Sequence, residues 1–98
     1  MKFTRSEHAT ERWKTIKESI GEISLHFLIQ DITMYVLSPE ADQLEHDKVY
    51  EVIRGDILYI LHKKRTATGQ THYQVVTLYR NNTPVRNATY VSEKTRIY

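Results

Sequence analysis

The sequence predicts an α+β domain in which N-terminal helices pack on a C-terminal antiparallel β-meander of three to four strands. Apolar residues recur at helical spacing before about residue 46, whereas residues 49–92 are rich in Ile, Val, Tyr and Thr. With 98 residues, the chain is too short for two separate hydrophobic cores. We therefore expect one domain over residues 1–98, with a helical part at about 4–46 and a β part at about 49–92.

A first helix is predicted over about residues 4–20. Thr4 and Glu7 form a T-x-x-E capping box, in which both side chains accept hydrogen bonds from backbone N–H groups at a helix start. An apolar stripe with spacings of four, three and four residues follows, made of Ala9, Trp13, Ile16 and Ile20. Trp13 is expected to anchor this stripe in the core, and Gly21 is a typical residue to end the helix.

Residues 22–38 fit two patterns. Helical spacing is found for Leu25, Leu28, Ile29, Ile32 and Val36, whereas strand alternation is found for Ile23, Leu25, Phe27 and Ile29. We favour an extended start followed by a helix through about Leu37. Because Ser38 precedes Pro39, the helix is expected to end there. The same pair is typical of a new helix start, so a short helix is predicted at about 39–46.

Residues 48–54 also have two interpretations. Val49, Glu51 and Ile53 alternate as in a strand, with Gly55 and Asp56 as a tight turn after it. Alternatively, a helical turn ends at Gly55. We favour the strand.

A β-hairpin is predicted from residues 56–65 and 71–80, with Gly69 between the two strands. One register aligns the apolar residues on a single face of the hairpin. It pairs Tyr59 with Leu78, Leu61 with Val76, Lys63 with Gln74, and Arg65 with His72. In this register the last two pairs are exposed to solvent.

A second hairpin is predicted through residues 81–84, which are turn-forming residues, into a strand at 85–92. This strand is expected to lie beside Val76 and Leu78, which completes the meander.

Charge is unevenly distributed along the chain, although the net charge is only +2. Residues 31–56 carry a net charge of −5 and residues 57–98 carry +6. We interpret the acidic segment and the basic sheet as neighbours that neutralise each other.

The composition excludes several classes of protein. The chain has no cysteine, so it has neither disulfides nor a thiolate zinc site. It has no secretory signal at its start and no apolar run of the roughly 20 residues that a membrane helix needs. We expect a soluble cytoplasmic protein without membrane partners.

No cofactor or metal is expected. The histidines form no H-x-H or H-E-x-x-H motif, and the adjacent Glu45, His46 and Asp47 are typical of a solvated loop. The three glycines do not form a phosphate-binding loop.

The leading functional hypothesis is a non-catalytic binding or regulatory module whose partner is another protein or a second copy of the chain. The contact surfaces would be the hairpin tip at 62–72, the basic turn at 80–86 and an uncovered sheet edge, which is suited to strand pairing in a homodimer.

A second hypothesis is a nucleic-acid-binding domain. Cations with neighbouring aromatic rings suit phosphate contact and base stacking. The candidate binding residues are Lys63, Lys64, Arg65, Arg80, Arg86, Tyr73 and Tyr79. However, cations placed on both faces of a hairpin are also typical of a solvated tip, and a tyrosine on the second face of a small sheet is often packed under a helix.

A third hypothesis comes from architecture alone. Helices followed by a basic antiparallel sheet in a chain of this size resemble the small α+β ribonuclease toxins of bacterial toxin–antitoxin systems. That resemblance implies metal-independent RNA cleavage by basic and aromatic side chains of the sheet. The candidates are His62 and His72 for proton transfer, Arg80 for the charge on the phosphorane-like transition state, and Tyr79.

Overall fold

The computed structural model describes residues 2–20 and 22–94, and within these ranges all side chains except those of residues 17, 19, 20, 22–28, 56 and 81–88. The elements are β1 (Lys2–Arg5), α1 (Glu7–Ile20), α2 (Glu22–Val36), α3 (Pro39–Asp42), β2 (Lys48–Arg65) and β3 (Thr71–Glu93). The predicted α+β class is confirmed. None of the described helices is long and apolar enough to cross a membrane.

The sheet is mixed, with the strand order β1-β3-β2. β1 lies parallel to β3, from the pair Lys2 and His72 to the pair Arg5 and Val75. β2 lies antiparallel to β3. The sheet therefore differs from the purely antiparallel meander that the sequence predicts, because the first residues of the chain add a parallel strand.

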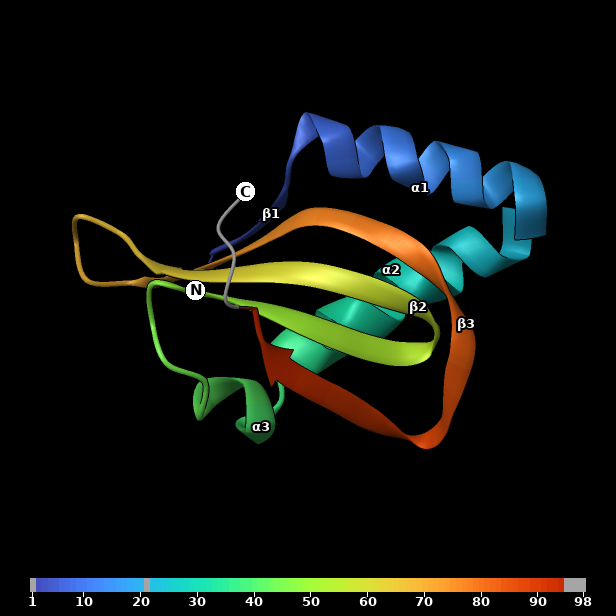
Figure 1. Cartoon of the computed structure of the whole chain (residues 1–98). Helices are drawn as coiled ribbons and strands as arrows, with labels where there is room; N and C mark the ends of the chain where they lie inside the picture. Colours follow the sequence, from blue (N-terminus) through green and yellow to red (C-terminus); the bar gives the residue numbers. More distant parts are fainter. Residues whose placement is uncertain (1, 21, 95–98) are drawn as a thin grey trace.

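β2 and β3 are long strands that bend back on themselves, as Figure 1 shows, so the sheet has five strands when straight segments are counted. The bend in β2 falls at Gly55, whose φ of 61° is easy only for glycine. Beyond the bend, Ile53 pairs with Tyr90. The strand predicted at 85–92 therefore pairs with the first half of β2, and the expected pairing with Val76 and Leu78 is wrong.

Helix α1 begins later than the T-x-x-E motif predicts. Ser6 is the capping residue, because its Oγ accepts a hydrogen bond from the backbone N–H of Ala9 at 3.0 Å. Thr4 instead lies in β1, where its hydroxyl contacts His72. The predicted capping box is wrong because the sheet takes up Thr4. Gly21, the predicted end of this helix, lies outside the described residues.

Helix α2 occupies the whole of Glu22–Val36, so the extended start that we favoured is wrong. The end of the helix agrees with the prediction to within a residue. Ser38 and Pro39 start a new helix as predicted, and Ser38 Oγ accepts a hydrogen bond from Ala41 N at 3.4 Å. This helix, α3, ends at Asp42, earlier than predicted.

The core lies between the sheet and the helices. In Figure 1, α1 runs alongside β3 and α2 crosses behind the strands. Trp13 is 3% exposed, which confirms it as a core residue, and its ring lies 6.4 Å from that of Tyr59. Around them the core contains Ala9, Ile16, Ile32, Tyr35, Val36, Ala41, Tyr50, Val52, Ile57, Leu61, Tyr73, Val75 and Leu78.

The hairpin of β2 and β3 starts in the predicted register and then shifts. Tyr59 pairs with Leu78 as predicted, but an irregularity between Ile60 and Leu61 moves the pairing by one residue. Beyond it the pairs are Leu61 with Val75, Lys63 with Tyr73, Lys64 with His72, and Arg65 with Thr71. The predicted partners of Leu61, Lys63 and Arg65 are therefore wrong.

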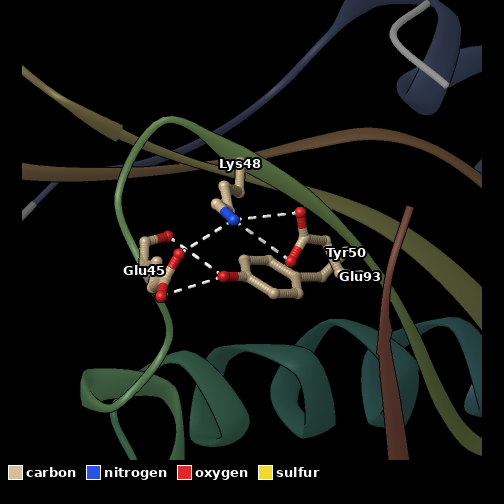
Figure 2. A network of polar contacts seen from close by, with 4 residues as sticks. All are labelled: Glu45, Lys48, Tyr50 and Glu93. Carbon is tan, nitrogen blue, oxygen red and sulfur yellow. Dashed lines mark hydrogen bonds and ion pairs between the residues drawn. The ribbon is translucent and has the colours of Figure 1, made fainter. Parts of the chain in front are cut away.

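A polar network fixes the loop after α3 to the sheet (Figure 2). Lys48 Nζ lies 2.9 Å from Glu45 Oε2 and 3.1 Å from Glu93 Oε1. The hydroxyl of Tyr50 donates to Glu45 O and accepts from Glu45 N, at 3.2 and 2.9 Å. The paired Lys48 holds the pKa of the Glu45 carboxyl below its ordinary range. Because the network joins this loop to both β2 and β3, it holds the loop over the hairpin.

Candidate functional site

Two of the predicted binding residues lie in the interior. Lys63 and Tyr73 are 1% and 0% exposed, so neither can contact a nucleic acid at the surface. The sequence prediction placed Lys63 in a solvent-exposed pair of the hairpin, whereas for Tyr73 it left open both base stacking and packing under a helix, and Tyr73 is packed. The prediction missed that α3 and the loop after it cover this part of the hairpin.

Lys63 completes the hydrogen bonding of this covering segment. Its Nζ donates to the carbonyl oxygens of Ala41, Asp42 and Leu44, at 2.8, 3.2 and 2.8 Å. The last carbonyl groups of a helix have no partner within the helix, and a buried carbonyl without a partner is costly. Burial lowers the pKa of Lys63. We therefore assign Lys63 a structural role.

Polar and basic side chains gather on the opposite face of the same strands. In one row across the three strands, His72 of β3 pairs with Lys2 of β1 and with Lys64 of β2. In the next row on the same face, Gln74 of β3 pairs with Thr4 of β1 and with His62 of β2. Paired residues point to the same face of a sheet, and alternate residues of a strand share a face. We call this set the basic face: Lys2, Thr4, His62, Lys64, His72 and Gln74. Lys2 is exposed and the other five are half-buried.

Two contacts order the basic face. Thr4 Oγ1 lies 2.7 Å from His72 Nε2, which links β1 to β3. Lys64 Nζ donates to Gln74 Oε1 at 2.8 Å, which links β2 to β3. Among the described residues, no hydrogen bond or ion pair joins these six side chains to a carboxylate.

Positive charge accumulates on the basic face. Burial lowers the pKa of His62, and so does Lys64, whereas Asp47 acts in the opposite direction. Burial also lowers the pKa of His72, followed by Lys2 and Lys64. Neighbouring cations create a positive potential that disfavours the protonated form of an imidazole. A bound anion would lower this potential. The arrangement can hold an anion, and its two imidazoles can accept and donate protons.

The remaining predicted binding residues lie apart from the basic face. Arg65 is exposed at the hairpin tip, where its Nη2 lies 3.3 Å from His46 Nδ1. Tyr79 is 38% exposed and carries the guanidinium of Arg12 at 5.0 Å from its ring centroid. Arg80 is exposed, next to Tyr79 on β3. The side chain of Arg86 lies outside the described residues.

Of the basic face, Lys64, His62 and His72 are predicted from the sequence, whereas Lys2 and Thr4 are not. The alternation of residues 2–5, in which Phe3 lies between two polar residues, is a strand signal that a four-residue segment carries only weakly. Within the described part of the chain, no group of three or more His, Asp or Glu side chains could hold a metal ion.

Among the cavities lined by described residues, two lie on the helix side of the sheet. The larger, of about 430 Å³, is lined by Met34, Tyr35, Ser38, Glu40, Arg54, Thr89 and Val91. Its Arg54 is already paired with Asp31, at 2.5 and 2.7 Å. The smaller, of about 270 Å³, is lined by Phe3, Thr4, Arg5, Trp13, Ile29 and Thr33.

Comparisons with family models, curated proteins and solved structures give no match to this chain.

Proposed function

We propose that the protein binds single-stranded RNA on the basic face and that His62 and His72 cleave it without a metal ion. The observation that supports this proposal is the row of Lys2, His72 and Lys64 across three strands, with His62 beside it. Phosphate contacts with such cations supply most of the affinity of a sequence-independent nucleic-acid site.

The two histidines have the relative position that acid–base catalysis needs. His62 and His72 lie on adjacent strands and on the same face, one diagonal step apart. Diagonal neighbours in a sheet are about 7–8 Å apart, which leaves room for a phosphate between the two rings. RNA rather than DNA is the substrate class because the reaction uses the 2′-hydroxyl group.

The reaction is a transesterification with balanced proton transfers. Neutral His72 accepts the proton of the 2′-hydroxyl as the 2′-oxygen attacks the adjacent phosphorus atom. The bond from phosphorus to the 5′-oxygen breaks, and protonated His62 donates a proton to this leaving oxygen. The products are a 2′,3′-cyclic phosphate and a 5′-hydroxyl group. Lys2 and Lys64 offset the charge that develops on the phosphoryl oxygens.

The assignment of roles follows one difference between the surroundings of the two rings. Burial, followed by Lys2 and Lys64, lowers the pKa of His72. Burial, followed by Lys64, also lowers the pKa of His62, but there the carboxylate of Asp47 acts in the opposite direction, so we assign His62 the role of proton donor. When His72 donates Nε2–H to Thr4, its Nδ1 carries the lone pair that accepts the proton. Thr4 is a positioning residue.

Binding and cleavage are tested separately. Binding is measured by fluorescence anisotropy with a labelled uridine oligonucleotide in low salt, for the intact chain and for K2E/K64E. We expect the double variant to lose binding and K14E, at an exposed lysine of α1, to retain it. Binding that is absent in the intact chain, or equal in both variants, would refute the proposal.

Cleavage is measured by mass spectrometry of the products in the presence of EDTA. General acid–base groups contribute about 10²–10⁴-fold, so we expect H62Q and H72Q to lose at least about 100-fold in rate while H8Q does not. RNA that is bound but never cleaved would leave the binding proposal standing and remove the catalytic one.

A second candidate function is self-association or protein binding through the end of α2. Met34 and Leu37 are 63% and 65% exposed, which is unusual for large apolar side chains so close together. Light scattering after gel filtration tests it. A dimer that M34K/L37K converts to a monomer, and that T15K on α1 leaves intact, would support this function. A monomer at every concentration would rule out self-association.

A further inference from the structure

We propose that the cavity between β1, α1 and α2 is a binding site for a small organic anion with an apolar body, such as an aromatic carboxylate. This proposal does not rest on the RNA-binding proposal, because the cavity lies on the helix side of the sheet. The side chains that line it are Phe3, Thr4, Arg5, Trp13, Ile29 and Thr33.

An unpartnered polar atom is the first observation. The Nε1–H group of Trp13 is buried and has no hydrogen-bond partner among the residues that the structure describes. A buried N–H group without a partner costs free energy, and buried tryptophans usually find an acceptor for it. Trp13 lines the cavity, and a ligand that displaces the side chains covering Nε1 would supply the missing partner with an acceptor oxygen.

The charge of the cavity selects the kind of acceptor. Arg5 is exposed, and its guanidinium lies 5.0 Å from the centroid of the Trp13 ring. No acidic residue is among the described side chains that line the cavity. A carboxylate accepts hydrogen bonds from both an indole N–H and a guanidinium, and the pair with arginine is charge-assisted.

The walls and the size define the rest of the ligand. Phe3 and Ile29 supply apolar surface, and both are half-buried beside the core. The hydroxyl of Thr33 is already donated to Ile29 O at 2.7 Å, so this wall offers the ligand little additional polarity. A volume of about 270 Å³ lies just below the range of about 300–1,000 Å³ that is usual for drug-sized ligands, so the ligand is small.

The chain contains one tryptophan, so its fluorescence reports on this site alone. The intact protein is titrated with benzoate, and with benzamide as a neutral molecule of similar shape. We expect a saturable change in Trp13 emission with benzoate and an apparent affinity for benzamide at least about tenfold lower, because the amide lacks the charge for Arg5. Equal affinities, or no saturable change with benzoate, would overturn the proposal.

The variant R5Q tests the contact with the anion. We expect R5Q to weaken benzoate binding about tenfold or more and R65Q, at an exposed arginine of the hairpin tip, to leave it unchanged. Circular dichroism shows whether each variant is folded. Because benzoate should also raise the melting temperature of the intact chain, a ligand-dependent shift in R5Q equal to that of the intact chain would count against the site.

Discussion

Lys63 and Tyr73 face each other across β2 and β3, and both donate a hydrogen bond to the carbonyl oxygen of Ala41. The two bonds are 2.8 and 2.9 Å long, and Lys63 Nζ lies 5.4 Å from the centroid of the Tyr73 ring. Through them the hairpin holds α3 and the loop after it. Lys63, which belongs to the cationic run of residues 63–65, thus stabilises the fold.

Replacement of Lys63 by methionine should destabilise the protein. The apolar stem of the side chain is preserved, but the carbonyl groups of Asp42 and Leu44 lose the donor Lys63, whereas Ala41 O keeps the hydroxyl of Tyr73. Unsatisfied buried polar groups cost about 1–3 kcal/mol, so we expect a loss of about 2–3 kcal/mol in the free energy of unfolding. Urea denaturation measures it, with K64M as the control. An equally stable K63M would show that these bonds contribute nothing.

Tyr73 should make the protein sensitive to alkaline pH. Burial raises the pKa of Tyr73 from 10.0 to about 12, with Asp42 and Tyr35 as smaller causes. The stability that depends on the protonated phenol is fully present below pH 10 and is lost as the pH rises through about 12. We expect Y73F to lower the free energy of unfolding by about 1 kcal/mol at neutral pH. As the pH rises from 10 to about 12, the free energy of unfolding of Y73F should fall less than that of the intact chain. Urea denaturation across this range checks both.

The two histidines of the basic face should make the protein sensitive to mild acid. The pKa of His62 and that of His72 are both below the ordinary value of 6.5. The unfolded chain therefore binds more protons, and stability falls as the pH drops through 6.5 and the lower pKa values of the folded state. Thermal unfolding of H62Q/H72Q should depend less on pH in this range. The same pH dependence in the intact chain and in H62Q/H72Q would contradict the lowered pKa values of His62 and His72.

The start of α1 should depend on Ser6 and not on Thr4. Ser6 Oγ accepts from Ala9 N and donates to Val76 O at 2.6 Å. Loss of a capping side chain costs about 0.5–2 kcal/mol, so S6A should lower the free energy of unfolding by about that amount. T4A should leave the helix content unchanged, as measured by circular dichroism. A larger loss of helix content in T4A than in S6A would support Thr4, and not Ser6, as the capping residue of α1.

Binding of RNA should depend on salt through few phosphate contacts. Single strands give a log–log slope of about −0.7 for each phosphate that is neutralised, so Lys2 and Lys64 together predict about −1.4. K64Q should reduce the slope to about −0.7. Anisotropy titrations between low and moderate salt measure it. A slope that K64Q leaves unchanged would place the phosphate contacts elsewhere.

Patterns within a single element could be read from the sequence. The apolar stripe of α1, the new helix start at Ser38 and the strand at 48–54 all follow from residues close together in the chain. The pairing of β1 with β3 could not be read in this way. It joins residues such as Thr4 and Gln74, far apart in sequence, through only four residues of strand.

Some residues of the candidate site could be predicted from local sequence and others could not. The composition of the hairpin alone is enough to predict His62, Lys64 and His72. The register shift after Ile60 and the cover provided by α3 decide that Lys63 and Tyr73 are interior residues, and neither event has a signal in the hairpin sequence. Lys2 joins the site only because of the parallel pairing.

The strand β1 separates two chemically different surroundings by its alternation alone. Lys2 and Thr4 belong to the basic face, whereas Phe3 and Arg5 line the smaller cavity, and Thr4 contacts both. If β1 leaves β3, the two proposed sites are lost together. A ligand of one proposed site that keeps this strand in place would therefore favour binding at the other, and thermodynamic reciprocity requires that two such ligands change each other's affinity by the same factor.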